Sequence, residues 1–96
     1  MTRTADLRRL RDLEGVGPAT MSDFEELDIR NVEQLAGEEP RELYDRLCGI
    51  KGVRIDPCCL DVLTCAVAQA RNANLPAAQR KWWYWSRVRK AARAPR

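Results

Sequence analysis

The sequence predicts a single all-α domain of five or six short helices, built on two units in which a glycine turn joins two helices. Apolar residues recur at helical spacing through most of the chain. Prolines stand where helices would begin, at Pro18, Pro40 and Pro57. A length of 96 residues suits one domain with a small core.

The first unit is centred on Leu13-Glu14-Gly15-Val16-Gly17-Pro18. Glycine accepts the positive φ that a tight reversal needs, and proline favours the first position of a helix. We therefore expect a helix that is capped by Thr4, a turn over residues 15–17, and a second helix over residues 18–27. The inward-facing side chains would be Leu7, Leu10, Leu13, Met21, Phe24 and Leu27.

This order of helix, glycine hairpin and helix resembles the helix-hairpin-helix motif of DNA repair and recombination proteins. In that family, backbone N–H groups of the hairpin and of the following helix contact a nucleic-acid phosphate, as helix N-termini generally can. The resemblance implies that the N–H groups here belong to Val16, Gly17, Ala19 and Thr20. The alternative is an αα-hairpin that only packs two helices.

The middle of the chain is predicted to hold two more helices. Asn31 would cap a short helix that ends at Gly37. A further helix would open at Pro40, and its inner face would carry Leu43, Tyr44 and Leu47.

A second, degenerate hairpin is predicted at Leu47-Cys48-Gly49-Ile50-Lys51-Gly52, with Gly49 in the place of Gly15. Lys51 and Arg54 beside it are well placed to contact an anion. Asp56 would cap the next helix, over residues 57–72, whose apolar circumference predicts burial on several sides.

The last predicted helix begins near Pro76 and carries three tryptophans. Trp82 and Trp85 share one face and are expected in the core, while Trp83 points elsewhere. A second interpretation is that the tryptophans form a stacking platform for unpaired bases, with adjacent basic residues for the backbone.

Basic residues gather at the C-terminal end. The segment 80–96 holds seven cations and no carboxylate, so the chain's net charge of +3 minus these seven leaves −4 on residues 1–79. We predict a folded domain over residues 1–86 and a flexible basic tail over residues 87–96 that adds nothing to the core.

Several motifs together resemble a small bacterial helix-hairpin-helix family described as "pathogenicity locus" or mitomycin resistance proteins. They are Gly15-Val16-Gly17-Pro18, Pro40-x-Glu42-Leu43-Tyr44, Leu47-Cys48, Asp56-x-Cys58, Cys65-Ala66-Val67 and Lys81-Trp82-Trp83-x-Trp85. The arrangement is also similar to the C-terminal domain of the competence regulator TfoX. Both resemblances imply a helical module without a defined enzymatic activity.

Cysteine spacing and the absence of histidine argue against a metal site. Cys58 and Cys59 point about 100° apart on a helix, and Cys65 lies two turns from Cys58. We expect buried, reduced thiols, and leave a redox role or a metal as alternatives. No nucleophile–base pair is visible, so we predict no enzymatic activity and no cofactor. No signal-peptide core or membrane span is visible either, and the prediction is a cytoplasmic protein.

The function predicted from these observations is weak, sequence-independent binding of DNA or RNA through phosphate contacts. Besides the four hairpin amides, the predicted contacts are Lys51, Arg54, Arg80, Lys81, Arg87, Arg89 and Lys90. The alternative is a protein-interaction adaptor without nucleic-acid binding, whose acidic helix over residues 18–27 docks a basic partner.

Overall fold

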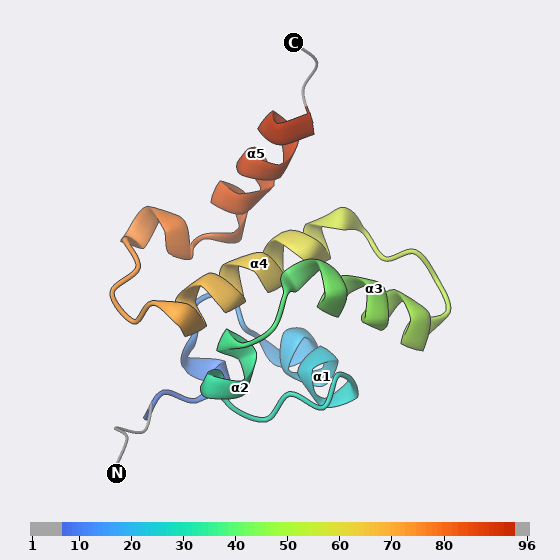
Figure 1. Ribbon diagram of the computed structural model, residues 1–96, viewed down its shortest axis with the longest axis horizontal. Helices are drawn as coiled ribbons and strands as arrows, with labels where there is room; N and C mark the ends of the chain where they lie inside the picture. Colours follow the sequence, from blue (N-terminus) through green and yellow to red (C-terminus); the bar gives the residue numbers. More distant parts are fainter. Residues whose placement is uncertain (1–6, 94–96) are drawn as a thin grey trace.

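The computed structural model describes residues 7–93, and this part of the chain is all-α, as predicted (Figure 1). Five α-helices and two 3-10 helices (η) follow one another in the described residues. They are η1 (Leu10–Asp12), α1 (Pro18–Glu26), α2 (Val32–Ala36), α3 (Pro40–Lys51), α4 (Pro57–Arg71), η2 (Ala77–Arg80) and α5 (Trp82–Arg93).

Helix α4 is the centre of the fold, since α2, α3, η2 and α5 all pack against it (Figure 1). Its inward residues include Leu63, Ala66 and Val67, each about 1% exposed. Around them lie the largest buried side chains of the other elements, namely Phe24, Leu27, Val32, Leu35, Leu43 and Leu47. Complete burial of one such side chain contributes about 1.5–3 kcal/mol. The predicted burial of the helix over residues 57–72 on several sides is therefore confirmed.

The first arm of the first unit is shorter than predicted. Residues 7–9 are not helical, and a single 3-10 turn, η1, stands where we expected an α-helix. Leu7 is 92% exposed, so its predicted inward orientation is wrong, whereas Leu10 and Leu13 are buried as expected. The predicted cap, Thr4, lies outside the described residues.

The second turn lies three residues beyond the predicted one. Gly49 is inside α3, and the chain reverses at Gly52, whose φ of 69° corresponds to the φ of 83° at Gly15. Gly52 closes α3 in the left-handed conformation that ends many helices. The N–H groups of Gly52 and Val53 donate to Gly49 O and Cys48 O, and Asp56 then caps α4 as predicted.

The C-terminal part differs from the prediction in two ways. The expected single helix is divided at Lys81 into η2 and α5. Helix α5 then runs on through Arg93, past Ser86, where we expected the fold to end and a flexible tail to begin. In Figure 1, the C-terminal end of α5 extends beyond the other helices, and Trp83, Arg87, Val88 and Lys90 of this helix are exposed.

Candidate nucleic-acid interface

The first hairpin presents an uncapped helix N-terminus. Gly17 is the N-cap residue of α1, makes no side-chain cap bond, and is followed by Pro18 with no acidic residue in the first turn. One of the four predicted amides is occupied, because the Val16 N–H donates to Leu13 O at 3.2 Å. The N–H groups of Gly17, Ala19 and Thr20 belong to the helix start, where no intrahelical acceptor exists.

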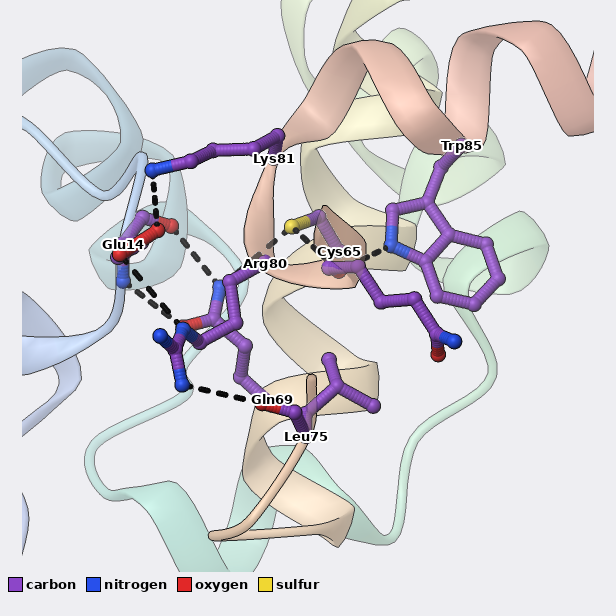
Figure 2. A network of polar contacts seen from close by, with 8 residues as sticks. Glu14, Cys65, Gln69, Leu75, Arg80, Lys81 and Trp85 are labelled. Carbon is purple, nitrogen blue, oxygen red and sulfur yellow. Dashed lines mark hydrogen bonds and ion pairs between the residues drawn. The ribbon is translucent and has the colours of Figure 1, made fainter. Parts of the chain in front are cut away.

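A buried glutamine holds this hairpin against α4. The Glu14 N–H donates to Gln69 Oε1 at 2.9 Å, and Gln69 Nε2 donates to Glu14 O at 3.0 Å. Figure 2 shows this pair of bonds beside Cys65, whose Sγ also accepts from Gln69 Nε2 at 3.5 Å. Gln69 is 4% exposed, so both backbone groups of Glu14 are satisfied away from solvent.

Two of the predicted contact residues pair with the Glu14 carboxylate instead of standing free (Figure 2). Lys81 Nζ lies 2.9 Å from Glu14 Oε2, and Arg80 Nε lies 3.6 Å from Glu14 Oε1. The hydrogen bond from Lys81 and the two positive charges hold the pKa of Glu14 below its ordinary value. The cluster of these three side chains keeps one net positive charge beside the first hairpin.

Lys51 is also engaged within the fold. Its Nζ lies 2.9 Å from Glu26 Oε1 and 3.4 Å from Asp23 Oδ1, so it connects the end of α3 to the acidic side of α1. The hydrogen bond from Lys51 to Glu26 raises the pKa of the lysine. Arg54 differs, because it is exposed and has no hydrogen-bonding or ion-pair partner in the described part of the chain.

Helix α5 carries the remaining predicted contacts on two different sides. Arg89 faces α4, where its Nε and Nη2 donate to the two oxygens of Asp61 at 2.8 and 3.0 Å. Arg87 and Lys90 are exposed and have no partner among the described residues. Together with Trp83, which is 48% exposed, they occupy positions i, i+4 and i+7 and so form one stripe along the helix.

We predicted that Trp82 and Trp85 belong to the core, but neither is among the buried residues that form it. Both are half-buried. Trp85 Nε1 donates to Gln79 O at 2.8 Å (Figure 2). The Trp85 ring also packs edge-on against Tyr84. Trp82 packs edge-on against Trp83, with ring centroids 6.0 Å apart. Trp82 therefore supports the exposed ring of its neighbour.

The cysteines occupy different environments within the described residues. Cys65 is buried, Cys48 and Cys59 are half-buried, and Cys58 is exposed at the start of α4, contrary to the predicted burial of all four. All four are free thiols there, and burial raises the pKa of Cys59 to about 11. No cluster of three acidic or thiol side chains with metal-binding geometry occurs among residues 7–93.

Sequence reasoning missed the Trp83–Arg87–Lys90 stripe as a unit because it treated the basic residues as a tail. It also missed Asp61, a lone carboxylate in an otherwise apolar stretch of α4. That isolation is the signal that could have revealed Asp61, since a buried carboxylate requires a partner. None of the described helices is long and apolar enough to cross a membrane.

Comparison with known proteins gives two matches. A family model described as pathogenicity locus (Cdd1) matches residues 3–91. The mitomycin resistance protein McrB of Streptomyces lavendulae is 39% identical over 87 residues, which cover 91% of this chain and 79% of that protein. No solved structure matches. The resemblance to the C-terminal domain of TfoX stays a prediction.

Proposed function

The chain belongs to the pathogenicity locus family, and on this premise we propose that it is a cytoplasmic module that binds single-stranded nucleic acid without reading base sequence. The observation that carries the proposal is the α5 stripe, defined by Trp83, Arg87 and Lys90. It combines an exposed ring with two unpaired cations. Aromatic rings flanked by cations bind single strands, because every base offers a flat face and every nucleotide a phosphate.

The charge pattern of α5 supports this proposal. Residues 82–96 contain no carboxylate, so nothing on this helix repels a phosphate. The one carboxylate that contacts α5 from α4, Asp61, is 1% exposed and already paired with Arg89. The negative charge of Asp61 is therefore neutralised before a nucleic acid approaches. The proposal assigns the protein a binding role and no catalytic step.

The first hairpin would add a phosphate contact that fixes orientation. Its helix is preceded by the N-cap residue Gly17, where an added Cβ would meet no atom within 4 Å, so the surface there is open. Backbone contacts of this kind position a nucleic acid and read no bases. By contrast, Lys51, Arg80 and Lys81 hold the fold together through their ion pairs, and we no longer assign them to the interface.

The alternative of a protein-interaction adaptor depended on the acidic outer side of α1. In the structure, Lys51 pairs with Asp23 and Glu26, which leaves less negative charge there for a basic partner. The same pairing weakens the repulsion that this helix would exert on a phosphate. The ion pairs of Lys51 therefore favour nucleic-acid binding over the adaptor.

Binding of a fluorescent single-stranded oligonucleotide at low salt, followed by anisotropy, tests the proposal. Removal of a stacked ring typically costs about 1–3 kcal/mol, so Trp83→Ala should weaken binding roughly 10-fold or more. Val88→Ala is the matched control, because Val88 is 45% exposed on the same helix and lies outside the stripe. Equal binding by both variants, or no binding by the native chain, would leave the adaptor as the better hypothesis.

A further inference from the structure

An open cavity of about 1020 Å³ lies between α3, the α3–α4 loop and α5. Three arginines from these three elements line it: Arg41, Arg54 and Arg89. One carboxylate, Asp45, is found among its described lining residues, and Arg41 Nε lies 3.5 Å from it. Arg89 is paired with Asp61 and Arg41 with Asp45, so the positive charge of Arg54 is the one that no carboxylate of the described residues balances.

The loop that carries Arg54 is fastened to α3 on both sides of that residue. Before it, the Val53 N–H donates to Cys48 O at 3.2 Å. After it, the Ile55 N–H donates to Cys48 Sγ at 3.4 Å, and the Tyr44 hydroxyl donates to Ile55 O. The arginine thus extends from a fixed backbone while its guanidinium has no partner in the described structure.

Arg89 is fixed in a different way. Its Nε and Nη2 bind both oxygens of the buried Asp61, which holds the guanidinium plane in one orientation. A guanidinium has five N–H donors, so three remain for a ligand in the cavity, namely both on Nη1 and the second one on Nη2. Arg41 adds a third guanidinium, whose Cζ lies 6.0 Å from the centre of the Tyr44 ring.

We propose that this cavity binds the phosphate monoester of a small organic ligand, of the nucleoside monophosphate class. Arginine suits phosphate because its planar fork can donate two parallel hydrogen bonds. A bare phosphate would fill little of the volume, whereas Val53, Pro57 and Leu60 beside the arginines provide apolar surface for a base or sugar. The same phosphate chemistry occurs at the 5′ end of a nucleic-acid strand. The inference does not depend on the α5 stripe, which does not line this cavity.

Isothermal titration of the native chain with adenosine 5′-monophosphate, inorganic phosphate and adenosine tests this site. We expect the monophosphate to bind most tightly and adenosine not to bind. Arg54→Gln should weaken the binding of adenosine 5′-monophosphate about tenfold, which corresponds to the loss of one charge-assisted hydrogen bond. Since Arg54 is exposed and unpaired among the described residues, this variant should have the same melting temperature as the native chain. Arg11→Gln, at an exposed and unpaired arginine in η1, removes the same charge and should not change the affinity.

Competition distinguishes the two sources of the phosphate. A 5′-phosphorylated oligonucleotide that displaces the monophosphate, when the same strand with a 5′-hydroxyl does not, would identify the strand end as the ligand. Failure of both strands to compete would identify the free nucleotide. The inference would be overturned if the monophosphate did not bind at low salt, or if Arg54→Gln bound it as tightly as Arg11→Gln did. Binding of the 5′-hydroxyl strand to the α5 stripe is measured in a separate experiment, and its result does not depend on whether the cavity binds the monophosphate.

Discussion

Glu14 joins three separate segments through one residue. Its backbone is held by Gln69 of α4, and its carboxylate is held by Arg80 and Lys81 just before α5. Since Gly15 follows directly, these contacts fix the starting point of the first hairpin. The position of the proposed phosphate-binding amides therefore depends on a carboxylate that does not itself contact nucleic acid.

The pH dependence of stability should reveal this role. In the folded state, the hydrogen bond from Lys81 lowers the pKa of Glu14 below its ordinary value of 4.5. Its stabilising contribution is therefore fully present above pH 4.5 and is lost as the pH falls through the lower, folded-state pKa. Thermal melting should show Glu14→Gln to be less stable than the native chain at pH 7, and the difference should shrink as the pH is lowered through the folded-state pKa of Glu14. A difference that stayed constant over this range would contradict the ion-pair explanation.

At the scale of the element, one ion pair links the part of α5 beyond Ser86 to α4. Asp61 is 1% exposed in α4, and Arg89 supplies both of its hydrogen bonds from α5. A buried carboxylate without a partner is strongly unfavourable, whereas a neutral side chain of similar shape is tolerated much better. We had expected that residues 87–96 could be removed without loss, and the structure gives a reason to expect the opposite.

A chain that ends at Ser86 should therefore be destabilised. Loss of Arg89 leaves Asp61 uncompensated, and we expect the melting temperature to fall by roughly 10 °C or more. Asp61→Asn in the shortened chain should recover part of this loss, because it removes the buried charge. The double variant Arg87→Gln/Lys90→Gln in the full chain should melt normally. Equal melting of the shortened and full chains would contradict the role assigned to the pair.

Capping residues and apolar spacing predicted α1 to α4 to within a few residues, because both act locally along the chain. The errors occurred where tertiary contacts prevail over local preference. Gly49 stays helical because Tyr44 and Leu47 on the same helix are buried, which outweighs the cost of about 1 kcal/mol for an interior glycine. The chain therefore turns at Gly52, whose positive φ ends the helix in the left-handed conformation that glycine adopts readily.

The candidate site was harder to predict, for a related reason. Basic residues were recognised as a group, but their partners lie far away in sequence, as Glu14 does from Lys81 and Asp61 from Arg89. Residue spacing along the chain does not predict ion pairs between residues so far apart in sequence. The stripe of Trp83, Arg87 and Lys90 could have been read from helical spacing, had the helix been extended beyond Ser86.

For the molecule as a whole, pairing and not composition decides where positive charge is available. Most described cations contact a carboxylate or a carbonyl within the fold. Those with no partner in the described part of the chain are Arg11, Arg54, Arg87 and Lys90. Two of them lie on the α5 stripe and two lie elsewhere, so the effect of position can be separated from that of net charge.

The salt dependence of nucleic-acid binding can separate the two unpaired cations on the α5 stripe from the two that lie elsewhere. Each phosphate neutralised on a single strand contributes about −0.7 to the slope of log affinity against log salt. Arg87→Gln/Lys90→Gln should therefore weaken binding of a 5′-hydroxyl strand and make the slope shallower by about 1.4. Arg11→Gln/Arg54→Gln removes the same net charge and should leave the slope within about 0.3 of the native value, since neither residue lies on the stripe. Similar changes in both variants would mean that nucleic acid responds to the overall charge of the molecule and not to α5.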